Sequence, residues 1–156
     1  MRLGDPVVKQ INLDRSRASL PVTTEVEVTN EQLYANDPAF FHAHLGPLLK
    51  YSACEWPGPA STLADAEEFT IRIYQDKAGL AELPAGARVL ELGCGWGSLT
   101  LSNAARFPKL HFTAFSNSPP QIEYIRATAA ERGLTNVAVF VEDYALFVQP
   151  GKLVRP

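Results

Sequence analysis

A short apolar segment that runs into three alternate glycines constrains this chain more than any other feature. Residues 89–98 read VLELGCGWGS. Only glycine reaches positive φ without a clash at Cβ, so alternate glycines let a backbone leave a strand, turn sharply and present N–H groups to a ligand. Glu91 stands near the end of the segment, where its carboxylate can meet polar groups of that ligand. The stretch therefore predicts a strand followed by a nucleoside-binding turn.

The spacing of these glycines separates two classes of nucleotide-binding turn. A dinucleotide-binding turn has G-x-G-x-x-G, with an acid about 20 residues further on that binds a ribose hydroxyl. Here the spacing is G-x-G-x-G, and the next strand-like segment ends in Ser116-Asn117-Ser118, without an acid. A nicotinamide-dependent oxidoreductase is therefore disfavoured. The pattern E-x-G-x-G-x-G resembles instead the first motif of methyltransferases that use S-adenosyl-L-methionine (SAM), in which the loop wraps the methionine part of the cofactor.

Beyond the glycines, strand-like and helix-like segments alternate along the chain. Strands are expected at residues 88–92, 110–115 and 137–142, and apolar residues at helical spacing indicate a helix in each interval between them. This order predicts right-handed βαβ units and a parallel sheet. The carboxyl ends of the strands then share one edge, where open α/β sheets bind ligands. The expected fold class is α/β with a Rossmann-like parallel sheet.

The part of the chain before residue 83 predicts helices rather than strands. Residues 36–38 (NDP) form a helix start signal, and residues 62–81 carry apolar side chains near helical spacing. Ser61 or Thr62 is the expected cap of that second helix, with Asp65 as the acid of a capping box. We therefore expect a flexible or extended tail over residues 1–30, an N-terminal helical cap region over 31–82, and a partial Rossmann-like SAM-binding domain over 83–156.

Composition excludes several classes of protein. The chain has 156 residues, 46% of them hydrophobic, and a net charge of -3, which suits one folded core and gives no basic stripe for nucleic acid. No apolar stretch is long enough to span a membrane and no signal core is present, so we expect a cytoplasmic protein, with a transit segment left open. Cys54 and Cys94 lie far apart without a histidine cluster, so no metal site is expected.

Five separated segments together resemble one known family. They are residues 45–47 (LGP), 51–56 (YSACEW), 62–63 (TL), 89–101 and 117–121 (NSPPQ). In this order they resemble the family that joins cyclopropane-fatty-acid synthases with coclaurine-type N-methyltransferases, and the match covers roughly residues 31–148. The stretch LGCGWGSLTL closely resembles the plant N-methyltransferase branch. The resemblance implies the N-terminal half of a class I SAM-dependent methyltransferase with an N-terminal helical extension.

The resemblance also implies a SAM site assembled from four segments. In the family a Tyr-Ser pair lies near the cofactor, the glycine loop and its acid hold the methionine moiety, an S/T-x-S-x-x-Q motif replaces the usual ribose-binding acid, and residues after the third strand meet adenine. The residues implied here are Tyr51 and Ser52; Glu91, Gly93, Gly95 and Gly97; Ser116, Asn117 and Gln121; and Glu142, Asp143 and Tyr144. Two alternatives stay open: a buried tyrosine with a capping serine at 51–52, and a solvated loop acid at 143.

Two departures from the family pattern bear on activity. Synthases usually read Tyr-Ser-Cys, whereas Ala53 stands in place of that cysteine and Cys54 follows one place later, so a bicarbonate site of the synthase type is not expected. Family members also continue into a fourth strand, a Glu-His pair and three further strands, which residues 151–156 do not contain. We therefore expect a chain truncated after the third core strand, for which no catalytic residue is assigned.

The same departure bears on association. In the family the first strand lies between the second and the fourth, so one side of residues 88–92 is expected to lack a hydrogen-bonded neighbour. Unpaired strand edges pair with other chains. This predicts marginal stability or self-association of the chain.

Two functions follow from these features. The first is a SAM-dependent methyltransferase acting on a small-molecule amine or a lipid acyl chain, present here as its cofactor-binding part. The alternative is a non-catalytic fragment that binds SAM weakly or serves as an interaction module. An amine acceptor must be unprotonated, which is the task of a general base such as the family's Glu-His pair.

Overall fold

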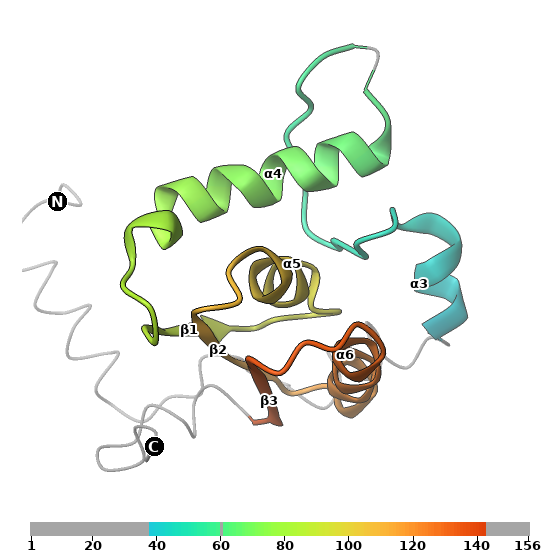
Figure 1. Ribbon diagram of the computed structural model, residues 1–156. Helices are drawn as coiled ribbons and strands as arrows, with labels where there is room; N and C mark the ends of the chain where they lie inside the picture. The colour runs from blue at the N-terminus through green and yellow to red at the C-terminus, as the bar shows by residue number, and fades with distance from the viewer. Residues whose placement is uncertain (1–37, 60, 143–156) are drawn as a thin grey trace, which may run out of the picture.

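Three parallel strands alternate with helices in the computed structural model, which describes residues 38–59 and 61–142 (Figure 1). The elements are α3 (Pro38–His44), α4 (Leu63–Lys77), the 3-10 helix η1 (Leu80–Glu82), β1 (Arg88–Leu92), α5 (Ser98–Arg106), β2 (His111–Ser116), α6 (Pro119–Glu131) and β3 (Val137–Val141). The predicted order of strands and helices is confirmed. The predicted tail over residues 1–30 lies outside the described residues.

The sheet has the strand order β1-β2-β3, and both pairs are parallel. Leu92 is in register with Phe115, and Phe115 with Phe140, so the three carboxyl ends meet at one edge as predicted. The second strand begins at His111 rather than at Leu110. The reason is that the N–H of Leu110 donates to the carbonyl of Phe107, which holds that residue in the preceding turn.

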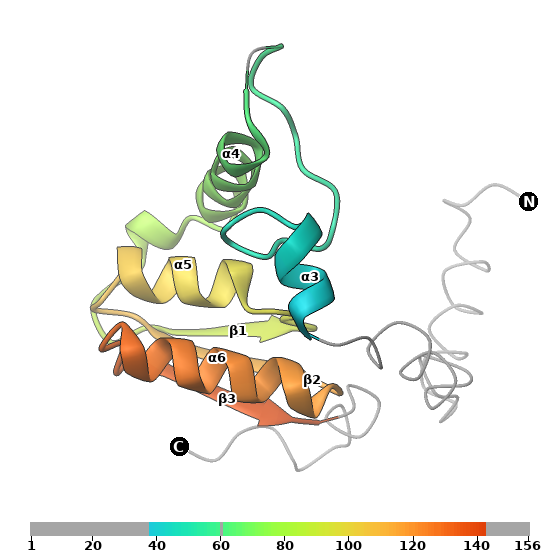
Figure 2. The ribbon, with the colours of Figure 1, turned by 90° about the vertical axis from the view of Figure 1, so that its right-hand side faces the viewer.

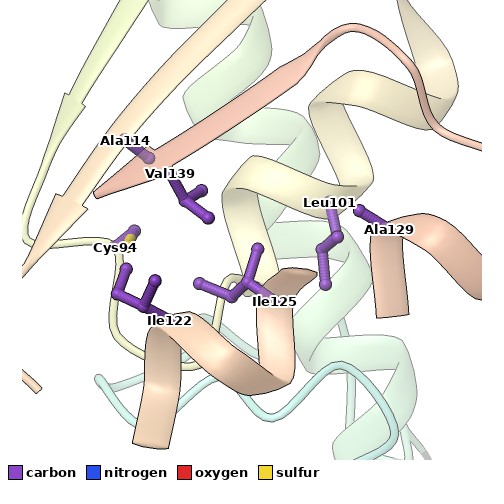
Figure 3. Close-up of a cluster of buried hydrophobic side chains, with 7 residues drawn as sticks. All are labelled: Cys94, Leu101, Ala114, Ile122, Ile125, Ala129 and Val139. Carbon is purple, nitrogen blue, oxygen red and sulfur yellow. The ribbon is translucent and has the colours of Figure 1, made fainter. Parts of the chain in front are cut away.

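Helices α5 and α6 cover the same face of the sheet, and α4 lies beyond α5 on the side away from the strands (Figures 1 and 2). The side chains between the sheet and α6 form the main core, and Figure 3 shows Ile122 and Ile125 pointing from α6 toward Val139. Ile122 and Ile125 have no exposed surface. The core members are Cys94, Leu101, Ala114, Ile122, Ile125, Ala129 and Val139. This packing fixes the position of the loop between β1 and α5.

The opposite face of the sheet carries exposed apolar side chains. Leu90, Leu92 and Phe140 are 43%, 46% and 46% exposed, because no helix of the described residues packs on that face. Within the same part of the chain, β1 pairs with β2 alone and has no partner on its other side. Among the described residues, helices therefore pack on one face of the sheet only.

Helix α4 begins as the sequence predicts and ends earlier. Thr62 is the N-cap, and its hydroxyl and the carboxylate of Asp65 form the reciprocal bonds of a capping box. The expected helix over residues 62–81 is wrong beyond Lys77. Gly79 adopts a left-handed conformation with φ of 60° and donates to the carbonyl of Asp76, which closes the helix before η1 begins.

None of the helices in the described ranges is long and apolar enough to cross a membrane. Over the same ranges, no group of three or more His, Cys, Asp or Glu side chains is arranged to hold a metal ion.

Candidate active site

A cavity of about 520 Å³ opens at the carboxyl ends of β1 and β2, a volume within the usual range for small-molecule sites. Its walls come from the segment after α3, the loop between β1 and α5, the end of β2, the start of α6 and one side chain of α4. The predicted residues that line it are Tyr51, Ser52, Glu91, Gly93, Gly95, Ser116, Asn117, Gln121 and Glu142. Asp143 and Tyr144 lie outside the described residues.

The glycine loop presents an open stretch of backbone to this cavity. Gly93 and Gly95 have φ of 78° and 53°, and a Cβ added at either would meet no atom within 4 Å. The N–H groups of Gly93 and Cys94 both donate to the carbonyl of Phe115, which ties the loop to the end of β2. The N–H groups of Gly95 and Trp96 donate to no backbone carbonyl outside a helix or strand in the described part of the chain. These two donors are available to a ligand.

At Gly97, unlike at Gly93 and Gly95, glycine is required by the packing of two helices. It does not line the cavity. It lies at the start of α5 with φ of 80°, and a Cβ there would lie 2.6 Å from Cγ1 of Ile125. Its small size therefore allows α5 and α6 to approach each other.

The carboxyl group of Glu91 lies in the cavity wall and has a raised pKa. The hydroxyl of Thr100 donates to Glu91 Oε2 over 2.6 Å. Burial raises the pKa of the Glu91 carboxyl to about 7, although the Thr100 hydrogen bond acts in the opposite direction. The group therefore titrates near neutral pH, and a cation placed beside it would favour its ionised form.

Cys94 lines the cavity but is not a nucleophile. Burial, together with the negative charge of Glu91, raises the pKa of its thiol to about 12. A thiol needs to ionise to react, so this side chain remains protonated and packs in the core.

Two of the three predicted ribose-binding residues, Ser116 and Gln121, are hydrogen-bonded to each other at the end of β2. The Ser116 hydroxyl donates to Oε1 of Gln121 over 2.8 Å, and the N–H of Ser118 donates to the same hydroxyl over 3.2 Å. Ser116 and Gln121 are buried, whereas Asn117 is half-buried. Since the carbonyl oxygen of Gln121 is engaged by Ser116, its amide NH₂ is the group that remains for a diol.

Residues 49–52, which precede α4 in the sequence, form a further part of the cavity wall. Tyr51 is 54% exposed, which contradicts the alternative of a buried tyrosine, and its ring lies 5.9 Å from that of Phe41. Ser52 caps no helix of the described residues; its hydroxyl accepts a bond from Lys50 Nζ over 2.7 Å. The same ammonium donates to the carbonyls of Ser52 and Ala53. Lys50 thus holds the segment in shape.

Sequence reasoning missed several lining residues. Lys50 and Leu49 directly precede the Tyr-Ser pair, and that adjacency was the only available signal. Tyr74 reaches the cavity from α4, and no motif marks it. Trp96 belongs to both the core and the cavity, because it is 4% exposed and lines the cavity. Its Nε1 has no hydrogen-bond partner in the described part of the chain.

Two curated relatives of this chain are plant N-methyltransferases. (S)-coclaurine N-methyltransferase of Thalictrum flavum subsp. glaucum is 32% identical over 146 residues, which are 94% of this chain and 40% of the relative. (S)-tetrahydroprotoberberine N-methyltransferase of Eschscholzia californica is 33% identical over 138 residues, covering 87% of this chain and 39% of the relative. The chain therefore spans about two fifths of the length of these relatives.

Solved structures agree with the sequence relatives. The crystal structure of coclaurine N-methyltransferase bound to N-methylheliamine and SAH superposes with a TM-score of 0.76 at 34% identity, over 89% of this chain and 39% of that one. A cyclopropane synthase of Mycobacterium tuberculosis gives a TM-score of 0.68 at 22% identity, over 81% of this chain and 43% of that one. The second likeness concerns the fold alone. The predicted class I methyltransferase fold is confirmed.

A family described as mycolic acid cyclopropane synthetase matches residues 23–153. This range includes every described residue, and it contains the glycine loop, the Tyr-Ser pair and the polar group after β2. The family resemblance predicted from the separated motifs is thereby confirmed, and the chain belongs to the mycolic acid cyclopropane synthetase family.

Proposed function

We propose that this chain is the cofactor-binding part of a SAM-dependent methyltransferase that acts on a small-molecule amine or a lipid acyl chain. The observation that carries the proposal is the cavity at the carboxyl ends of β1 and β2. It brings the glycine loop, the Glu91 carboxyl and the polar group around Gln121 to one place. These groups come from two separate segments of the sequence, residues 91–97 and 116–121, and the fold brings them together.

The chemistry of the cavity wall fits SAM. The methionine part of SAM carries an ammonium and a carboxylate, which suit the Glu91 carboxyl and the open N–H groups of Gly95 and Trp96 respectively. The ribose diol suits the amide groups of Asn117 and Gln121. The indole N–H of Trp96 is a further buried donor in the same wall. Glu142, Asp143 and Tyr144 remain the proposed adenine-binding residues.

In this proposal the residues of the chain bind and orient rather than react. SAM supplies a methyl group on a sulfonium, which is already electrophilic. Holding the acceptor atom in line with that methyl at about 3 to 3.5 Å removes much of the entropic barrier. Tyr51 and Ser52 line the cavity together with the glycine loop and would shield that line from water. We assign no general base among the described residues.

The amine acceptor is supported by the names of the relatives. Two curated relatives that are 32% and 33% identical to this chain over the aligned residues are named N-methyltransferases. A lipid acyl chain is supported by the family name and by a weaker relative, 27% identical over 99 residues, named a probable fatty acid methyltransferase of Mycobacterium tuberculosis. A cytoplasmic location and the division at residue 83 also remain part of this proposal.

Calorimetric titration with SAM tests the proposal, and Gly95→Val is the decisive variant. Its side chain would fill the space above the loop at a backbone φ of 53°. Gly133→Val is the matched control, because Gly133 has φ of 66°, equally open surroundings and no place in the cavity wall. We expect micromolar binding to persist in the control and to be lost in Gly95→Val. Absence of binding by the folded wild-type chain would contradict the proposal.

One observation favours a second function, a non-catalytic interaction module. As far as residues 38–59 and 61–142 show, one sheet face is uncovered and one side of β1 is free, which presents apolar and hydrogen-bonding groups together. The SAM titration separates the two functions: binding that is lost in Gly95→Val supports the first, and a folded chain that associates with another chain but does not bind SAM supports the second.

A further inference from the structure

The segment that leads into the Tyr-Ser pair contains a strained residue. Leu49 has φ of 53°, and among the described residues it is the only one other than glycine with a positive φ. A left-handed conformation is unfavourable for a side chain of this size, and it persists only where the surroundings determine it. Leu49 is buried against Phe41 and Trp96. Packing accounts for its side chain, but its backbone needs a further cause.

The carboxylate of Glu67 supplies that cause. Glu67 lies on α4 and has no exposed surface. Its Oε2 accepts the N–H of Leu48 over 2.9 Å, and its Oε1 accepts the N–H of Lys50 over 2.9 Å. The N–H of Leu49 itself donates to the carbonyl of Gly46. One carboxylate therefore binds the N–H groups of both residues that flank the left-handed residue.

Gly46 shows how closely the carboxylate fits this turn. A Cβ at Gly46 would lie 2.5 Å from Oε2 and 2.6 Å from Cδ of Glu67. Gly46 does not have a positive φ, so its backbone conformation does not require glycine. The close approach of Glu67 does require it.

Helix α4 contacts the same segment at two further points. The hydroxyl of Thr70 accepts the N–H of Glu55 over 2.8 Å, and the ring of Tyr74 lies 5.4 Å from Nζ of Lys50. Positions 67, 70 and 74 share one face of a helix. Figure 1 shows this helix above the segment that follows α3. Since residues 49–52 line the cavity, that face of α4 sets the shape of one cavity wall.

We propose that Glu67 is the positioning residue of the cavity: its carboxylate fixes the left-handed turn at Leu49 and so holds Tyr51 and Ser52 in the cavity wall. Glu67 does not itself line the cavity. The proposal rests on the proposed function where it concerns SAM, but the turn and the place of Tyr51 can be measured without a ligand.

The test compares Glu67→Gln with Glu68→Gln. Glutamine keeps the shape of Glu67 but has one acceptor oxygen, so its NH₂ group would face a backbone N–H. We expect amide hydrogen exchange to accelerate at Leu48 and Lys50 while the amides of α5 and β2 keep their rates. SAM affinity should fall about tenfold. Glu68→Gln is the matched control, because Glu68 is exposed and pairs with Arg72 on the surface, and it should change neither quantity.

A second variant changes the turn rather than the carboxylate that binds it. Gly46→Ala places a methyl group against the Glu67 carboxylate and should reproduce the pattern of Glu67→Gln. The two changes should be non-additive when they are combined, because both disturb one contact.

Two results would overturn the proposal: unchanged exchange at Leu48 and Lys50 in Glu67→Gln, or faster exchange with unchanged SAM affinity. If the wild-type chain does not bind SAM, the proposed function fails separately. The NMR signals of the Tyr51 ring then decide the proposal, because a shift of these signals in Glu67→Gln supports a positioning role and unchanged signals overturn it.

Discussion

At the scale of single residues, the Glu91 carboxyl makes the cavity sensitive to pH. Its pKa is raised to about 7 by burial, so it is largely protonated in mildly acidic solution. An ammonium group bound beside it would favour the ionised form and release a proton. We therefore expect SAM affinity to increase roughly fivefold between about pH 6 and about pH 7, and to level off above about pH 8. Calorimetry in buffers of different ionisation enthalpy measures both the affinity and the proton release.

The control for this prediction is Glu91→Gln, which keeps the acceptor toward Thr100 but cannot ionise. Its affinity should be weaker and independent of pH over the same range. A wild-type affinity that does not change with pH would mean that Glu91 does not meet the cation.

The same carboxyl should make stability depend on pH. It ionises near its ordinary pKa of 4.5 when unfolded and near 7 when folded, so over this range the unfolded state binds fewer protons. The free energy of unfolding should therefore fall by about 3 kcal/mol as pH rises from about 4.5 to about 7, and then stay level. The lowered pKa of Asp65 acts in the opposite direction at lower pH, below its ordinary value of 3.8. Urea unfolding of wild type and Glu91→Gln at several pH values should show this slope in the wild type only.

At the scale of the elements, the approach of α5 to α6 depends on Gly97. An added Cβ would lie 2.6 Å from Cγ1 of Ile125, and the φ of 80° adds backbone strain. Gly97→Ala should lower the free energy of unfolding by about 1 to 2 kcal/mol for strain and a further 1 to 3 kcal/mol for overpacking. Gly133→Ala has a similar φ but no neighbour within 4 Å, so it should show only the strain. If urea unfolding shows the same loss of free energy of unfolding in both variants, the Ile125 side chain moves aside without destabilising the protein.

Local patterns predicted the elements well because their causes are local. The capping box joins Thr62 and Asp65 across three positions, and each strand is a short apolar run. The end of α4 was missed because Leu80 continues the apolar spacing beyond Gly79.

The candidate site was only partly predictable from the sequence, because some of its contacts join residues that are far apart in the chain. The glycines and the Tyr-Ser pair belong to motifs, whereas Glu67 meets its partners across 17 and 19 positions. No local pattern encodes that contact. The requirement for glycine at Gly97 comes likewise from Ile125, a residue of the next helix.

At the scale of the whole molecule, the sheet presents two surfaces of different character. The helix side is a packed core, while the other side exposes Leu90, Leu92 and Phe140 beside the free edge of β1 in the described part of the chain. An edge strand with an apolar face is a template for another chain. Burial of these side chains against a second copy would remove apolar surface from water, which favours association.

We therefore expect the isolated chain to exceed its monomer mass of 17.1 kDa in light scattering, and to do so increasingly with concentration. Leu90→Lys combined with Phe140→Lys should shift the distribution toward monomer, since a charge on this face opposes pairing. Leu83→Lys is the matched control, because Leu83 is 38% exposed but lies outside the sheet, and it should leave the mass unchanged. A monomer at every concentration, with cooperative unfolding, would show that the uncovered face does not drive association. In that case the interaction-module function would lose its main support, while the cofactor-binding function would be unaffected, because the cavity lies at the strand ends and neither Leu90 nor Phe140 lines it.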